Sequence, residues 1–98
     1  MLKNFRSYQL AVQLYRGCKR QALPSYLKDQ LLRASLSIVL NTSEGSAKPY
    51  PKDRKRLYAI ALGSCRETQA LLMLLGRDDL FKIADQVGAC LYRLTHSR

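Results

Sequence analysis

The stretch that decides the fold runs from Leu27 to Ser46 and reads LKDQLLRASLSIVLNTSEGS. One apolar row recurs at the three- and four-residue spacing of a single helical face: Leu27, Leu31, Ala34 and Ile38. A second apolar row covers the adjoining face: Leu32, Leu36, Val39 and Leu40. A helix that is apolar around so much of its surface usually packs against neighbours on more than one side. The sequence therefore predicts a helix around which the others pack, and Gly45 predicts a left-handed stop at its end.

A narrow row of polar residues interrupts this apolar surface at the same helical spacing. Unpaired buried polar groups cost about 1–3 kcal/mol each, so such a row needs partners. Antiparallel packing against a later helix would bring Arg33 close to Glu67, and Ser37 close to Ser64. We interpret the whole set as a structural polar network that fixes helix register or subunit contacts: Arg33, Ser37, Asn41, Glu44, Ser64 and Glu67.

The charge of the chain is strongly positive for its length. The 98 residues suit one domain, residues 1–98, with a single modest core. Lysine and arginine total 17 against 7 acidic residues, which gives a net charge of +10. Such a charge indicates an anionic partner, most often nucleic acid. A charge that serves solubility alone, with no specific partner, is the alternative.

The three cysteines, Cys18, Cys65 and Cys90, cannot all pair within one chain. None lies in a Cys-x-x-Cys motif and the one histidine is His96, so we expect no metal site and no cofactor. Each cysteine lies at or beside an apolar stripe, where it can pack as a small hydrophobic residue. Unpaired cysteines of this kind indicate a reducing cytoplasm. The sequence contains neither a signal-peptide pattern nor the roughly 20 apolar residues of a membrane span. We therefore expect a cytoplasmic protein with no membrane partner.

Four amphipathic segments separated by short breaks predict an all-α fold, an antiparallel up-down-up-down four-helix bundle. The expected helices span roughly residues 4–21, 27–46, 52–75 and 78–96. Expected helix-end residues are Ser25 as one N-cap, Asp78 or Asp79 as another, Pro51 as a first residue, and Gly76 as a stop. The main buried row of the third helix is expected to be Leu57, Ile60, Ala61, Ser64, Thr68, Leu71 and Leu75.

Two clusters of cations are candidate nucleic-acid contacts. The first surrounds Pro49-Tyr50-Pro51, with Asp53 as its one opposing acid, and comprises Lys48, Lys52, Arg54, Lys55 and Arg56. Positive charge at a helix start opposes the helix dipole, which favours an external role such as phosphate contact over a merely solvated face. The second cluster closes the first helix, where the dipole alone would account for it: Arg16, Lys19 and Arg20. Tyr50 could stack on a base, although packing within the loop is the commoner role for a tyrosine.

Three local patterns resemble the bacterial "four helix bundle protein" family. They are Arg33-Ala34-Ser35-Leu36-Ser37, Asn41-Thr42-Ser43-Glu44-Gly45-Ser46 and Ala61-Leu62-Gly63-Ser64-Cys65-Arg66-Glu67. Named members of that family are encoded by intervening sequences inside 23S ribosomal RNA genes, and the accessory variability proteins of diversity-generating retroelements are more distant relatives. The resemblance extends from Phe5 to about Leu94. Where the family usually has Ile-Ala, this chain has Thr42-Ser43.

The resemblance implies a four-helix bundle that assembles into a homopentameric ring. For the retroelement relatives it also implies a positive surface that contacts a reverse transcriptase and nucleic acid. We therefore expect a non-enzymatic basic bundle protein that forms a homopentamer and associates with RNA or DNA. The alternative is an accessory subunit of a diversity-generating retroelement that binds its reverse transcriptase and template RNA.

An enzymatic interpretation would take Glu44 and Glu67 as paired acid–base carboxylates. No nucleophile, metal-ligand set or phosphate-binding loop accompanies them in the sequence. We therefore expect no catalytic residues and no enzyme activity.

Overall fold

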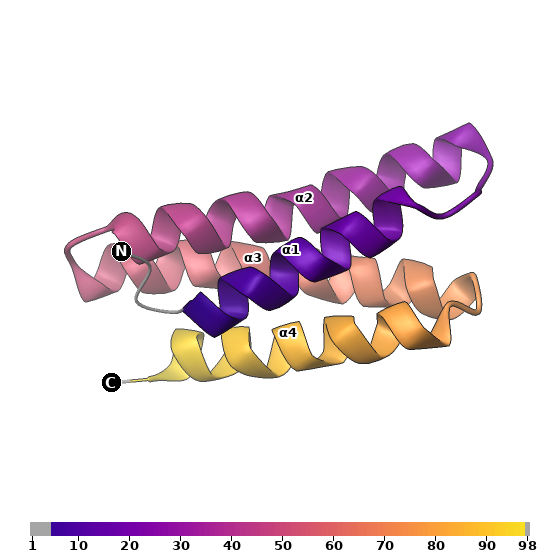
Figure 1. Ribbon diagram of the computed structural model, residues 1–98. Helices are drawn as coiled ribbons and strands as arrows, with labels where there is room; N and C mark the ends of the chain where they lie inside the picture. The colour runs from indigo at the N-terminus through magenta and orange to yellow at the C-terminus, as the bar shows by residue number, and fades with distance from the viewer. Residues whose placement is uncertain (1–4, 98) are drawn as a thin grey trace.

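Four helices make up nearly all of residues 5–97, the part of the chain that the computed structural model describes (Figure 1). They are α1 (Phe5–Lys19), α2 (Ser25–Ala47), α3 (Pro51–Leu74) and α4 (Asp78–His96). Consecutive helices run in opposite directions and are joined by short loops. No strand occurs within these residues, so the expected all-α, four-helix fold is confirmed. Residue 4, the expected start of the first helix, lies outside the described residues.

The four helices pack side by side, one at each corner of a square in cross-section. The bundle measures 41 × 19 × 19 Å along its principal axes. Both α1 and α3 pack against α2 and α4, whereas the backbones of the two diagonal pairs stay farther apart in residues 5–97. The prediction that α2 is the helix around which the others pack is therefore wrong. The reason is that each helix turns one apolar stripe to a shared axis and packs against two neighbours, with the α2–α3 contact the most extensive.

The core lies along that shared axis. Its largest fully buried apolar side chains come from all four helices: Leu14, Leu31, Ile38, Leu72, Val87 and Leu91. Three residues that the sequence placed on apolar helical rows lie at the surface instead. Leu36, Leu40 and Ile60 are 38%, 57% and 44% exposed, respectively. In a square of four helices, α2 and α3 each have an outer side with no neighbouring helix, and these residues lie there.

The C-terminal end of α3 follows the sequence expectation. Gly76 has a φ of 68°, and it is the one residue with positive φ among those described. Its N–H donates to the Met73 carbonyl at 3.1 Å, and the Arg77 N–H donates to the Leu72 carbonyl at 2.9 Å. This pair of bonds satisfies carbonyls that the helix end would otherwise leave unpaired. The predicted stop at Gly76 is confirmed.

Gly45 does not end α2, which continues to Ala47, so that prediction is wrong. The glycine is buried where α2 crosses α3. A Cβ atom at this position would lie 2.8 Å from Tyr58 Cε1 and 3.2 Å from Leu57 Cβ. Glycine is needed here because the two helices approach closely, and the helical backbone continues through it.

The N-terminal ends of the helices differ in part from the predictions. Pro51 is the first residue of α3, as expected. Ser25 and Asp78 are the first residues of α2 and α4, whose N-caps are Pro24 and Arg77 and carry no side-chain capping bond. The predicted capping roles are therefore wrong. The aspartates instead lie in the first turn of α4, where negative charge suits the helix dipole.

The cysteines act as small core residues. Cys18 and Cys65 are fully buried, and all three cysteines are free thiols. Burial raises the pKa of Cys18 and of Cys65 to about 11 each, so both are neutral near pH 7. The Cys65 thiol donates to the Ala84 carbonyl at 3.2 Å and links α3 to α4. No described helix is long and apolar enough to span a bilayer.

The packing leaves two buried side-chain atoms of the described residues without a hydrogen-bond partner, Thr42 Oγ1 and Arg77 Nε. Thr42 is fully buried, and its Oγ1 has no hydrogen-bond partner. Thr68 is equally buried, but its Oγ1 donates to the Ser64 carbonyl at 2.9 Å. The two threonines therefore allow the effect of the unpaired hydroxyl to be measured.

We expect Thr42→Val to raise the free energy of unfolding by about 1 kcal/mol, because it removes a desolvated hydroxyl that makes no bond. The matched change Thr68→Val should lower it by about 1 kcal/mol, because it removes a bonded hydroxyl. Urea denaturation followed by circular dichroism measures both. A Thr42→Val protein that is destabilised as much as Thr68→Val would contradict the assignment.

Candidate nucleic-acid interface

A polar seam runs along the contact between α2 and α3. The Arg33 guanidinium pairs with the Glu67 carboxylate across the two helices. The Ser37 and Ser64 hydroxyl oxygens lie 2.8 Å apart. Asn41 Nδ2 donates to the Ser37 carbonyl at 2.9 Å and to Ser37 Oγ at 3.1 Å. The Arg33–Glu67 and Ser37–Ser64 contacts join the two helices and hold the register of α2 against α3, whereas the Asn41 bonds lie within α2 and orient Ser37.

Glu44 lies outside this seam. Its carboxylate is 3.8 Å from Lys48 Nζ, one helical turn along α2, in an exposed pair. Glu67 is paired with Arg33 instead. Each of the two glutamates that an enzymatic interpretation would combine is thus paired with a different cation.

The loop between α2 and α3 is held by one of the predicted phosphate-binding residues. Arg54 Nη1 donates to the Lys48 carbonyl at 3.1 Å and to the Pro49 carbonyl at 2.9 Å. The Arg54 backbone N–H donates to the Tyr50 carbonyl at 3.1 Å. Arg54 therefore clamps the loop, a role that the sequence pattern did not indicate.

Three other cations of the first cluster make no ion pair with the described residues. Lys52 and Arg56 are exposed and Lys55 is half-buried. The spacing of these three residues places them on neighbouring turns of one α3 face. Within residues 5–97 the ion pairs are Arg33–Glu67 and Lys48–Glu44, so none neutralises these three side chains. We call the whole group the cationic end: Lys48, Lys52, Arg54, Lys55 and Arg56.

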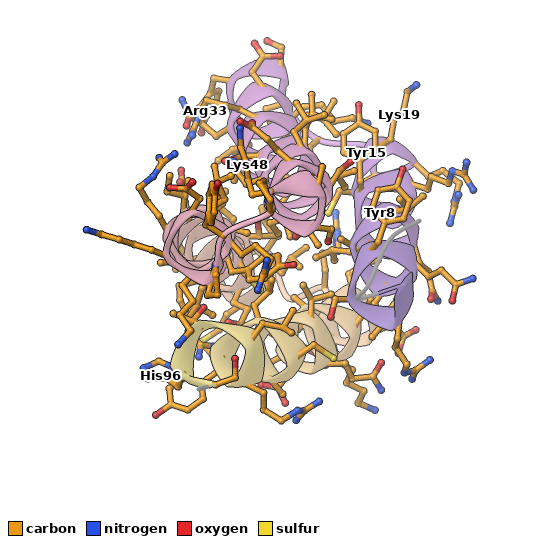
Figure 2. All side chains as sticks on the ribbon, turned by 90° about the vertical axis from the view of Figure 1, so that its left-hand side faces the viewer. Tyr8, Tyr15, Lys19, Arg33, Lys48 and His96 are labelled. Atoms are coloured by element: carbon orange, nitrogen blue, oxygen red, sulfur yellow. The ribbon has the colours of Figure 1, made fainter. Side chains whose placement is uncertain are left out.

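The C-terminal end of α4 lies at the same end of the bundle as the α2–α3 loop (Figure 1). Figure 2 looks onto this end and shows Lys48 and His96 there. The His96 ring stacks on Tyr92 with centroids 4.0 Å apart and an interplanar angle of 23°. Tyr92 and Tyr50 are 51% and 68% exposed. The Tyr92–His96 pair was missed in the sequence, although its four-residue spacing on a helix could have indicated it.

A family model described as 23S rRNA-intervening sequence protein matches residues 4–93 of this chain. The chain belongs to the 23S rRNA-intervening sequence protein family. The resemblance drawn from the seam and from the end of α2 is therefore confirmed. Comparisons with curated proteins and with solved structures found no match.

In this member of the 23S rRNA-intervening sequence protein family, the second cation cluster is remote from the first. Arg16, Lys19 and Arg20 close α1 at the opposite end of the bundle (Figure 1). Lys28 Nζ donates to the Lys19 carbonyl at 2.7 Å and also to the Gln21 carbonyl. It satisfies the last carbonyls of α1 in the way cations do at helix ends. The two clusters therefore do not form one continuous surface.

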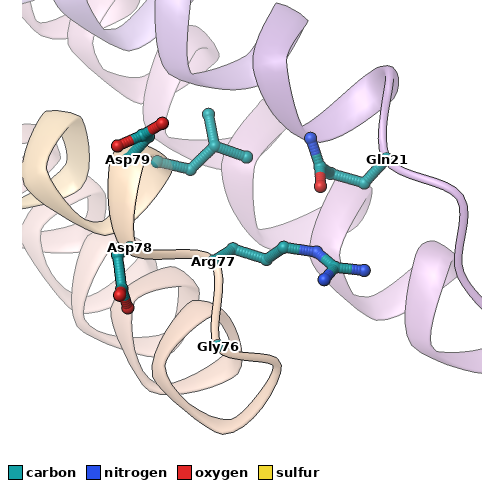
Figure 3. A pocket seen from close by; sticks show the side chains of 6 residues that line it. Gln21, Gly76, Arg77, Asp78 and Asp79 are labelled. Carbon is teal, nitrogen blue, oxygen red and sulfur yellow. The ribbon is translucent and has the colours of Figure 1, made fainter.

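A shallow hollow lies near that second end, where the α3–α4 loop faces the residues after α1. Figure 3 shows Arg77 directed toward Gln21, with Asp78 and Asp79 on the other side of the loop. Two carboxylates beside one guanidinium give the hollow no net positive charge. It is therefore poorly suited to a phosphate group, and we do not include it in the candidate interface.

Arg54→Met should lower the free energy of unfolding by about 1–2 kcal/mol, because two loop carbonyls lose a charged donor. Lys52→Met removes the same charge two residues away, where no described hydrogen bond is lost, and should change stability by less than about 0.5 kcal/mol. Thermal or chemical denaturation at one salt concentration compares them. Equal stability of the two variants would show that Arg54 does not clamp the loop.

Proposed function

We propose that this 23S rRNA-intervening sequence protein is a non-enzymatic, self-associating bundle that binds the phosphates of RNA or DNA through its cationic end. The proposal rests on the position of Lys52, Lys55 and Arg56 and on their lack of ion pairs. They lie on one face, at the start of α3, and no ion pair within residues 5–97 neutralises them. Lys52 lies in the first turn of α3, where a cation opposes the helix dipole, so local helix energetics does not favour that position.

The charge of the whole chain supports the same proposal. A net charge of +10 attracts any polyanion over a distance of about a Debye length, and this raises the association rate. Phosphate contacts then release counterions, so affinity falls steeply as salt rises. This salt dependence is the property that an experiment can measure most directly.

The first test is parallel titration of RNA, DNA and heparin at several salt concentrations. We expect binding at low salt, with log Kd rising linearly with log salt. Replacing Lys52, Lys55 and Arg56 together by glutamine should reduce the slope by about 2–3, because each lost phosphate contact removes roughly 0.7–0.9. Binding of heparin with no binding of either nucleic acid would reduce the proposal to general polyanion attraction and so reject it.

The chain offers a matched control for this test. Replacing Arg16, Lys19 and Arg20 by glutamine removes the same charge from the opposite end of the bundle. This second triple variant should keep most of the slope and affinity. If both triple variants weaken binding equally, net charge alone governs the interaction and the cationic end is not the site. Absence of any RNA or DNA binding at low salt would reject the proposal entirely.

The self-association part of the proposal is supported by the outer side of α2 and α3. We call a group of exposed residues there the apolar patch: Leu36, Leu40, Ala59, Ile60 and Gly63. No charged residue occurs in residues 34–43 of α2 or 57–65 of α3, so two positively charged copies can approach here with little repulsion. A Cβ added at Gly63 would meet nothing within 4 Å, so another helix can come close to this backbone. Covering such a patch is a common reason for assembly.

Light scattering at micromolar concentration should therefore give a mass near five times that of one chain, the homopentamer that the family resemblance implies. Leu40→Glu should yield a folded chain of lower mass, because it introduces a charge into the apolar patch. Ala89→Glu, an exposed change on α4, should leave the mass unchanged. A stable wild-type monomer under these conditions would contradict self-association, and any other fixed oligomer would contradict the pentamer.

The alternative function uses the same cationic end for a different complex. In it, the protein is an accessory subunit of a diversity-generating retroelement and binds the reverse transcriptase with its template RNA. A reverse transcriptase gene with template and variable repeats beside the gene would favour this alternative. Location of the gene inside a 23S ribosomal RNA gene would favour the first function.

A further inference from the structure

Tyr50 is exposed in the loop that precedes α3, within the same run of sequence as the cationic end. It lies between Pro49 and Pro51, with Lys48 and Lys52 beyond the two prolines, and 68% of its surface is exposed. A tyrosine that packs within its own loop would be largely buried. The commoner role considered from the sequence therefore does not describe this side chain.

The backbone that carries Tyr50 has little freedom. A residue that precedes proline is restricted to extended conformations, and Tyr50 has a φ of −103° and a ψ of 136°. The Arg54 side chain bonds the Lys48 and Pro49 carbonyls, and its backbone N–H bonds the Tyr50 carbonyl. The ring is thus presented from a position fixed on both sides, so a ligand that stacks on it need not order the loop first.

An exposed aromatic ring beside unpaired cations is suited to one form of nucleic acid in particular. Every base has a flat face that can stack on such a ring, while neighbouring phosphates contact the cations. In a duplex the faces of the bases are already stacked on one another, so they are accessible chiefly in single strands, loops and ends. An exposed ring beside cations therefore distinguishes single strands from duplexes, and it does not distinguish one base sequence from another.

We propose that the cationic end binds single-stranded nucleic acid, with an unpaired base stacked on Tyr50 and the adjoining phosphates held by Lys52, Lys55 and Arg56. This inference rests on the proposed function and names its substrate class. Single-stranded RNA and single-stranded DNA share the chemistry, so both are included as separate arms of the test.

The test uses three labelled probes, each in an RNA and a DNA version: a single strand, the same strand with abasic sites, and its duplex. Heparin is the reference polyanion. The abasic strand keeps the phosphates and lacks base faces. The wild-type protein should bind the intact single strand at least roughly fivefold more tightly than the abasic strand at one low salt concentration. Its affinity for the duplex should resemble that for the abasic strand.

Tyr50→Ala should weaken binding of the intact single strand by roughly fivefold or more and leave abasic-strand and heparin binding unchanged. Tyr50→Phe should keep the wild-type affinity, because it retains the ring. Tyr26→Ala is the matched control, since Tyr26 is 69% exposed at the start of α2, at the opposite end of the bundle. It should behave as wild type. Circular dichroism confirms that each variant is folded.

The possible failures are distinguishable. If all nucleic-acid probes bind equally well and Tyr50→Ala changes none of them, this inference is overturned while the proposed phosphate binding stands. If no nucleic acid binds at low salt, both are overturned. The inference requires the Tyr50 effect in at least one of the RNA and DNA arms, and an equal loss in Tyr26→Ala would also overturn it.

Discussion

The close contact between α2 and α3 is the constraint on which the rest of the structure depends. Gly45 leaves space for the Tyr58 ring, and Ser46 Oγ lies 3.2 Å from the Tyr58 hydroxyl. Farther along the pair, the Ser37–Ser64 bond fixes the same register. The loop that carries Tyr50 joins these two helices, so their register also sets where the cationic end begins. The position of the candidate interface therefore depends on the register of α2 against α3.

The four helices and their order could be predicted from the sequence because amphipathic periodicity is a property of each helix by itself. Which apolar positions stay at the surface could not, because that depends on how many neighbours a helix has. Leu40 and Ile60 follow the same spacing as buried residues, and only the square packing leaves them outside. Gly45 illustrates a second ambiguity. Glycine near the end of a periodic stretch suits both a stop and a close helix contact, and the difference is set by a side chain from α3.

The residues of the candidate site could be predicted only in part. The cations could be read directly from the sequence, but their separate uses could not. Arg54 bonds two carbonyls that become its neighbours only once the loop has turned, whereas Lys52 in the same run makes no such contact in the described residues. The contacts across the seam were easier to predict from the sequence, because antiparallel helices pair their positions in a regular order. Arg33 with Glu67 and Ser37 with Ser64 are the examples.

The uncharged middle of α2 and α3 has a geometrical consequence. The molecule is a rod 41 Å long whose positive clusters lie toward its two tips, while its waist carries apolar side chains. Rods that associate sideways at the waist keep both tips free. A closed ring of them would have two basic rims on opposite faces, separated by about the length of one rod. Because rotation about a ring axis keeps every rod pointing the same way, the cationic ends of all copies would lie together on one of these two rims.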